Sequence, residues 1–163
     1  MNPSQQAQAG TRNHSEVLDG WKCHPDETKP LEPLLRLWVP QPAPWLNSND
    51  RRHRMAQAKI TKAWREAASE VGVGLPTFEQ PVRIVAEVWK SRLGDYDAGN
   101  LYPTAKACVD GYRDAGILIE DNNRYVVGPD MRHGGKGEPG LFFLFSKVLE
   151  ITPNHTVETS NND

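Results

Sequence analysis

The clearest hydrophobic pattern in the chain is an alternation within residues 81–92. Val82, Ile84, Ala86 and Val88 fall on one face of an extended chain, and the residues between them fall on the other. A repeat of two residues is typical of a strand with one buried face. We therefore expect a strand here.

Three shorter apolar segments also predict strands: residues 34–39, 125–127 and 141–151. The first is stopped by a proline-rich turn at residues 40–44. A glycine-rich stretch, residues 129–140, separates the other two. We expect that stretch to be a mobile loop.

Residues 51–71 place apolar side chains at helical spacing. The segment follows Asn47–Asp50, a cluster of residue types that cap helix N-termini, and it is followed by Gly72 and Gly74. The pattern predicts an amphipathic helix with one apolar stripe. The stripe expected to face the core consists of Ala56, Ile60, Ala63, Trp64, Ala67 and Val71.

A second helix is expected after the loop at residues 94–100. Pro103 suits its first turn and Gly116 suits its C-terminal end. A short apolar piece, residues 117–119, comes next. The resulting order, β-α-β-α-β-β, predicts an α+β fold with a small mixed β-sheet and two main helices. The expected buried edge of the second helix consists of Ala105, Val109 and Tyr112.

The length of 163 residues accommodates one domain with tails. Residues 1–32 and 153–163 are polar and lack periodicity, so we expect flexible tails around a domain at residues 33–152. The longest apolar run, Leu141–Phe145, is far shorter than the ~20 residues of a membrane helix. The N-terminus lacks a signal pattern, and the only two cysteines suit neither a disulfide framework nor a zinc site. We therefore expect no membrane partner and a cytoplasmic location.

The formal net charge of −2 conceals a strong segregation of charge along the chain. Residues 50–92 carry a net charge of +4, and residues 93–163 carry −5. Residues 51–65 contain six cations and no acid, the pattern of a helix that faces a polyanion. The alternative interpretation is a solvated helix face. The candidate DNA-binding residues are Arg51, Arg52, Arg54, Lys59, Lys62 and Arg65.

A set of carboxylates surrounds the second helix: Asp95, Asp97, Asp110, Glu120 and Asp121. A helix over residues 103–114 spans ~18 Å. An extended return over residues 116–121 covers ~20 Å, which brings Asp121 back level with Asp97. Facing carboxylates repel unless a cation lies between them, and Mg²⁺ takes such oxygen ligands. The alternatives are turn residues and a surface ion pair between Lys106 and Asp110.

A basic substrate face beside an acidic metal pocket is the arrangement of a Mg²⁺-dependent nuclease. Lys106 lies one turn before Asp110, where its charge can hold a scissile phosphate. Together these residues predict phosphodiester hydrolysis.

The stretch from Asp97 to Asp121 resembles the RusA family of phage and prophage Holliday-junction resolvases. The resemblance lies in the combined spacing of an Asp, an Asn, a Lys, a second Asp, a Gly and a final Asp. In this sequence these are Asp97, Asn100, Lys106, Asp110, Gly116 and Asp121. The segment from Val39 to Arg54 is similar to the strand and proline-rich turn that precede the basic helix of that family. The resemblance covers residues 34–151.

The resemblance implies a RusA-like fold and a homodimer that cuts four-way or branched DNA by paired symmetric nicks. Asp97, Lys106 and Asp121 are the implied catalytic residues, and Asn100 is implied to support the site. Mg²⁺ is the implied cofactor, with Mn²⁺ as a substitute. Asp97 and Asp121 are the implied metal ligands, and Asp95, Asp110 and Glu120 are further candidates. The implied setting is the cytoplasm of a bacterial or phage-infected cell, in DNA recombination and repair.

One position departs from the family pattern, because Gly99 stands where the second Asp directly precedes the Asn. Either Asp97 fills the first position and the second ligand is missing, or a two-residue insertion makes Asp95 and Asp97 the pair. We prefer the first alignment, because it keeps the spacing from Asp97 to Asn100 without a gap.

Two other functions stay open on the sequence. The first is a junction-binding protein whose catalysis is weakened or lost because of Gly99. The second is a small α+β module that binds RNA or a protein partner. Binding that does not weaken as salt rises would favour the module over contacts to phosphates.

Overall fold

The order of strands and helices in the computed structural model is the expected β-α-β-α-β-β. The structure describes residues 33–92 and 94–148, so both predicted tails and the predicted end of the last strand lie outside the described residues. A short 3-10 helix precedes the second α-helix. The elements are β1 (Leu35–Pro40), α1 (Arg54–Gly72), β2 (Val82–Lys90), η1 (Ala98–Leu101), α2 (Tyr102–Asp114), β3 (Val126–Lys136) and β4 (Gly140–Lys147).

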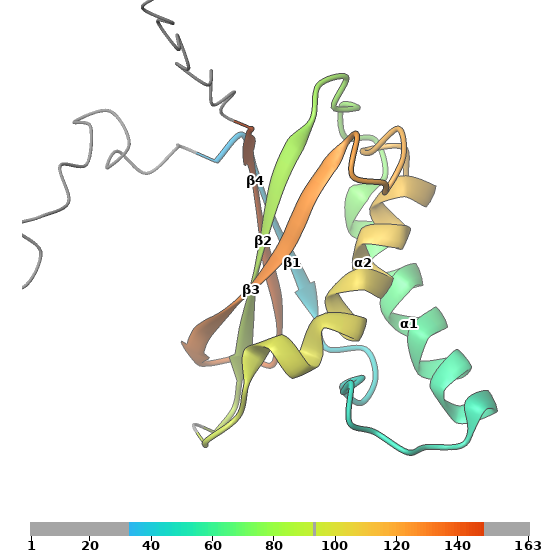
Figure 1. The fold of residues 1–163 in the computed structure, drawn as a ribbon, viewed down its shortest axis with the longest axis vertical. Helices are drawn as coiled ribbons and strands as arrows, with labels where there is room; N and C mark the ends of the chain where they lie inside the picture. The colour runs from blue at the N-terminus through green and yellow to red at the C-terminus, as the bar shows by residue number, and fades with distance from the viewer. Residues whose placement is uncertain (1–32, 93, 149–163) are drawn as a thin grey trace, which may run out of the picture. The chain divides into compact units, whose positions relative to one another are not determined.

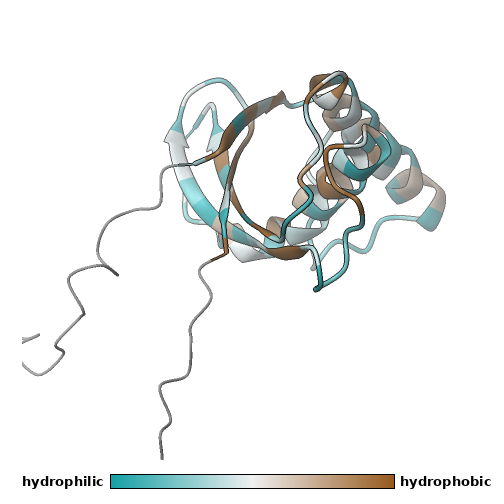
Figure 2. Ribbon diagram, turned by 90° about the horizontal axis from the view of Figure 1, so that it is seen from above, coloured by the Kyte–Doolittle hydropathy of each residue, from teal (hydrophilic) through white to brown (hydrophobic). Residues whose placement is uncertain are grey.

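The four strands form one mixed sheet in the order β1-β4-β2-β3. β4 is antiparallel to both of its neighbours, whereas β2 and β3 are parallel. A parallel pair needs a crossover connection, and α2 provides it. Both helices lie on one face of the sheet (Figure 1). Figure 2 shows the curvature of the sheet around that face. The predicted α+β class is confirmed.

The core forms between the sheet and the two helices. The alternation in β2 is confirmed, because Val82, Ile84, Ala86 and Val88 are all buried. β4 supplies Phe143 and Phe145, whose rings pack at 5.2 and 5.4 Å from the ring of Tyr112 on α2. The predicted buried edge of α2 is likewise confirmed.

The first helix begins at Arg54, three residues later than predicted. Its N-cap is His53, whose Nδ1 accepts a hydrogen bond from the Met55 N–H at 3.3 Å. The predicted capping cluster forms a separate turn instead, because the Ser48 N–H donates to the Asn100 carbonyl at 2.8 Å. This bond joins the turn to η1, and the Asp50 N–H donates to the Asn47 carbonyl at 2.9 Å within the turn.

The apolar stripe of α1 is displaced from the predicted one. Trp64, Ala68 and Gly72 are the buried positions, and Ala56 is exposed. All of residues 51–56 are exposed, so the first turn extends beyond the surface on which the helix packs. The remaining stripe residues, Ile60, Ala63, Ala67 and Val71, are half-buried.

The predicted mobile loop at residues 129–140 is wrong. β3 runs through most of it, and only residues 137–139 connect it to β4. The glycines have a packing role, because a Cβ on Gly134 would lie 2.2 Å from Nε1 of Trp89. Glycine within a strand marks such a close approach. Trp89 pairs with Gly135 across the two parallel strands.

None of the helices in the described part of the chain is both long enough and apolar enough to span a membrane.

α1 and α2 cross at a point where only glycine fits. A Cβ on Gly111 would lie 2.2 Å from the backbone oxygen of Arg65 and 3.0 Å from the backbone nitrogen of Ser69. Backbone atoms of a packed helix cannot turn aside as the end of a flexible side chain can. The close spacing of the two helices therefore depends on the absence of a side chain at Gly111.

We predict that Gly111→Ala lowers the free energy of unfolding by about 1–3 kcal/mol, the usual cost of overpacking. The helix propensity of alanine opposes this loss by up to about 1 kcal/mol. Urea unfolding of the full chain measures the difference. Gly94→Ala is the control, because nothing lies within 4 Å of a Cβ at Gly94. A Gly111→Ala variant as stable as the wild type would contradict the close contact.

Candidate functional site

Lys106 on α2 links two carboxylates from different parts of the chain. Its ammonium donates hydrogen bonds to Asp110, one turn further along α2, and to Asp121, which follows the helix. Arg113 also lies near Asp121, with 3.7 Å between its guanidinium and a carboxylate oxygen. The structure therefore brings together three of the predicted site residues: Lys106, Asp110 and Asp121.

The end of α2 directs the chain back toward Lys106. Gly116 has φ +81°, its N–H donates to the Arg113 carbonyl at 3.0 Å, and the Ile117 N–H donates to the Tyr112 carbonyl at 3.0 Å. These bonds form a Schellman motif, in which glycine is favoured because of its positive φ. The Ile117 carbonyl then accepts a hydrogen bond from the Phe78 N–H at 2.8 Å. The chain that leads from Gly116 to Asp121 is thus held in place at Ile117 by a backbone hydrogen bond.

The ion pair between Lys106 and Asp121 favours the charged forms of both groups. Burial alone would lower the pKa of Lys106, but its hydrogen bonds to Asp110 and Asp121 outweigh burial and raise the pKa. The Lys106 ammonium in turn lowers the pKa of Asp121 to about 2. Lys106 is therefore a cation at neutral pH and Asp121 an anion, so Lys106 can stabilise negative charge but cannot act as a base.

Asp97 and Asn100 lie just before the N-terminal end of α2. Asp97 caps η1, and its Oδ1 accepts a hydrogen bond from the Gly99 N–H at 2.8 Å. The Asn100 N–H donates to the Asp97 carbonyl at 3.1 Å. Asp97 is exposed and Asn100 is half-buried. These contacts fix the backbone that enters α2 and leave an oxygen of Asp97 accessible to a ligand.

The predicted metal ligands do not gather into one cluster. Within residues 33–92 and 94–148, no group of three His, Cys, Asp or Glu side chains is close enough to hold a metal ion. Asp95 and Glu120 are both exposed. Asp110 and Asp121 do converge on one positive charge, the Lys106 ammonium. Their oxygens have the chemistry that Mg²⁺ prefers, although Lys106 already occupies the position between them.

Three of the six cations in residues 51–65 form ion pairs with carboxylates that lie outside this segment. Two guanidinium nitrogens of Arg65, Nε and Nη2, donate hydrogen bonds to the two carboxylate oxygens of Asp114 on α2. This ion pair lowers the pKa of Asp114. Two further pairs join Arg52 to Asp50 at 3.2 Å and Lys62 to Glu66 at 3.6 Å. The three other cations of the run make no ion pair with the described residues and are exposed; they are Arg51, Arg54 and Lys59.

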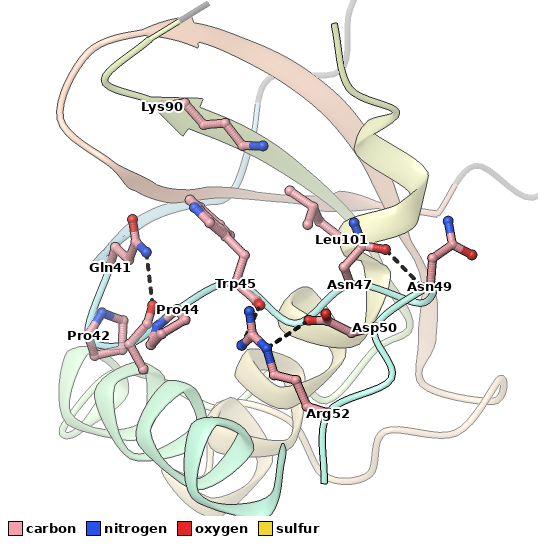
Figure 3. A pocket seen from close by; sticks show the side chains of 11 residues that line it. Gln41, Pro42, Pro44, Trp45, Asn47, Asn49, Asp50, Arg52, Lys90 and Leu101 are labelled. Carbon is pink, nitrogen blue, oxygen red and sulfur yellow. Dashed lines mark hydrogen bonds and ion pairs between the residues drawn. The ribbon is translucent and has the colours of Figure 1, made fainter. Parts of the chain in front are cut away.

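A pocket of 760 Å³ opens beside the proline-rich turn, and the sequence did not single it out (Figure 3). Trp45 points into it, toward Lys90 at the end of β2. The sequence signals were a tryptophan within a turn and a lysine that ends a buried strand. Neither signal indicates that two residues 45 positions apart in the sequence lie close together in the fold. The pocket is lined by Gln41, Pro42, Ala43, Pro44, Trp45, Asn47, Asn49, Asp50, Arg52, Lys90 and Leu101.

The ion pair of Asp121 makes the stability of the fold dependent on pH. Its pKa in the folded state, about 2, lies below the ordinary value of 3.8. The stabilisation is therefore complete above the ordinary value and is lost as the pH falls toward 2. We expect Asp121→Asn to destabilise the protein at pH 6 and to lose that effect between pH 4 and pH 2.

Urea unfolding of the wild type and of Asp121→Asn at these pH values measures the effect. In a Lys106→Met background the pH-dependent difference should shrink, because the main partner charge is gone and only Arg113 remains near Asp121. A difference that stays constant from pH 6 to pH 2 would contradict the ion pair.

Comparison with known proteins adds no relative. No protein-family model matches the chain, and no curated protein matches it.

Proposed function

We propose that this protein is a Mg²⁺-dependent, structure-selective endodeoxyribonuclease of the RusA type. It resolves Holliday junctions and other branched DNA by paired symmetric nicks, in DNA recombination and repair. The observation that supports this proposal most is the hydrogen bonding of Lys106 to both Asp110 and Asp121. Three motif positions spread over sixteen residues of sequence thus meet at one point on the surface.

In this mechanism Lys106 contacts a non-bridging oxygen of the scissile phosphate. Its two carboxylate partners keep it protonated, so a full positive charge is present where negative charge develops during hydrolysis. Asn100 and the η1 cap hold Asp97 at the entry to α2. The ammonium is already oriented before DNA arrives, which lowers the cost of reorganisation.

Asp97 and Asp121 would hold the Mg²⁺ ion, with Asp95, Asp110 and Glu120 as further candidate ligands. When bound, Mg²⁺ activates water and neutralises charge on the phosphate, and Mn²⁺ can replace it. Lys106 lies between Asp110 and Asp121, so its ammonium and a bound cation would share these carboxylates. The same carboxylates thus position Lys106 and attract the metal.

Phosphate contacts would come from the exposed cations at the start of α1. Arg51, Arg54 and Lys59 have no acidic partner among the described residues, so their charge is available to DNA. Arg52, Lys62 and Arg65 are engaged in ion pairs and contribute less. Such contacts read the shape of the backbone rather than the identity of the bases.

Paired nicks require two sites related by symmetry, which a homodimer supplies. The sheet face opposite the helices has a surface suited to a second copy. No described helix covers that face (Figure 1). Trp38 and Phe142 pack against each other there at 6.5 Å and are only half-buried. The proposed setting of the dimer is the cytoplasm of a bacterial or phage-infected bacterial cell.

We expect the purified chain with Mg²⁺ to convert a synthetic four-way junction into nicked duplexes with 5′-phosphate and 3′-hydroxyl ends. Asp121→Asn should reduce cleavage by about 100-fold or more, since it removes a charged group of the site. Junction binding should stay within about twofold of the wild type. Denaturing gels measure cleavage, and gel shift without Mg²⁺ measures binding.

Asp130→Asn is the matched control, because Asp130 pairs with Arg83 on the sheet. It should cut like the wild type. If the wild type leaves the junction intact, or if Asp121→Asn cuts as fast as the wild type, the proposed activity is wrong.

The second candidate function is a junction-binding protein with weak or no catalysis. The observation that favours it is Gly99. A Cβ at this position would lie 3.1 Å from Oδ1 of Asp97, so an aspartate here would place a second carboxylate beside the first. The wild-type chain lacks that pair.

Gly99→Asp tests this candidate. If the wild type binds junctions without cutting them, the substitution should start cleavage, because it restores the second carboxylate. If the wild type already cuts, Asp95→Ala identifies the ligand: loss of cleavage would mean that Asp95 and Asp97 form the pair. Cleavage that Gly99→Asp neither starts nor increases would overturn the lost-ligand explanation.

A further inference from the structure

The pocket beside Trp45 has a fixed aromatic wall. One side of the Trp45 ring packs against the buried Trp64, with 5.1 Å between ring centroids and 33° between planes. The Trp64 Nε1–H donates to the Pro44 carbonyl at 3.0 Å, which ties the turn to α1. Trp45 is half-buried, and its side chain extends into the pocket (Figure 3). Its indole is therefore a flat surface that is held in place before any ligand binds.

Lys90 supplies a positive charge that nothing in the described residues neutralises. Its ammonium lies 3.6 Å from the centroid of the Tyr96 ring and 5.8 Å from that of Trp45. It makes no ion pair with the described residues, and its partial burial lowers its pKa. Aromatic rings attract a cation without cancelling its charge. An anion at this point would gain a charge-assisted contact.

The rest of the wall is polar and nearly balanced in charge. Arg52 and Asp50 also line the pocket, but they pair with each other at 3.2 Å. Lys90 therefore sets the net charge of the pocket at about one positive unit. Side-chain amides from Gln41, Asn47 and Asn49 line the same space, and amides hydrogen-bond the edges of bases.

The volume and the chemistry fit one nucleotide. The pocket volume of 760 Å³ lies within the ~300–1,000 Å³ of small-molecule sites. A single phosphate matches the single free ammonium, and a base matches the flat indole. An acidic peptide would satisfy Lys90 but would leave the face of Trp45 unused.

We propose that this pocket binds one unpaired nucleotide of a DNA strand, with the base stacked on Trp45 and the adjacent phosphate on Lys90. The inference rests on the proposed function for the nature of the polymer, because strands at a branch point expose bases that can leave the stack. The pocket then gives the protein a contact that an intact duplex does not offer. It supplies selectivity for branched DNA that phosphate contacts from α1 do not.

The test measures binding of fluorescein-labelled single-stranded dT8 to the full chain by anisotropy, at low salt and without divalent cations. Lys90→Gln should weaken binding by removing the phosphate contact. Trp45→Leu should weaken it by removing the stacking surface while keeping an apolar side chain against Trp64. Each loss should be about 5- to 100-fold, as for other base–aromatic and phosphate contacts.

Two controls separate the pocket from general effects. Lys147→Gln removes the same charge at the far end of the sheet, since Lys147 pairs with Val82 and not with the Lys90 end of β2. It should bind dT8 within twofold of the wild type. An eight-residue abasic strand should lose affinity with Lys90→Gln but not with Trp45→Leu, because it has phosphates and no bases. Thermal unfolding verifies that each variant is folded.

The outcomes distinguish this inference from the proposed function. If the wild type cuts junctions while both pocket variants bind dT8 normally, the pocket inference is overturned and the nuclease stands. If the wild type does not cut but both variants lose dT8 binding, the nucleotide pocket stands without the nuclease. If Trp45→Leu weakens binding of dT8 and of the abasic strand equally, stacking of a base on Trp45 is wrong.

Discussion

The ion pairs of Lys106 determine the arrangement of the candidate site. Asp110 reaches the ammonium from within α2, but Asp121 reaches it only because the chain reverses at Gly116 and is held by the Phe78 hydrogen bond to Ile117. Two carboxylates that would repel each other are thereby bridged by one ammonium, which offsets one of their two negative charges. In the proposed function the same ammonium contacts a phosphate, so the stability of the fold and the proposed chemistry share one set of groups.

A second consequence of folding is the redistribution of positive charge. The cations of residues 51–65 look like one continuous basic face, yet the fold pairs half of them with carboxylates, most firmly Arg65 with Asp114 on α2. That pair lies beside the contact between Gly111 and the Arg65 backbone, so it belongs to the helix interface. Unneutralised charge is left at the start of α1 and, separately, at Lys90 in the pocket.

The residues of the motif around α2 fall into two groups in the structure. Lys106, Asp110 and Asp121 follow the motif and meet in space. Asp97 lies at the start of the α2 unit with Gly99 beside it, and it does not join a three-carboxylate cluster in the described residues.

The local sequence determined the features that depend on neighbouring residues within one strand or helix. The alternation in β2, the limits of α2 at Pro103 and Gly116, and the helical spacing of Lys106 and Asp110 all follow from local pattern. Features that depend on a distant partner were decided by the tertiary structure. The glycines after Pro129 form a strand because Trp89 packs over them, and Lys90 meets Trp45 only in the fold. Periodicity reports which side of an element is buried, but it carries no information about what that side contacts.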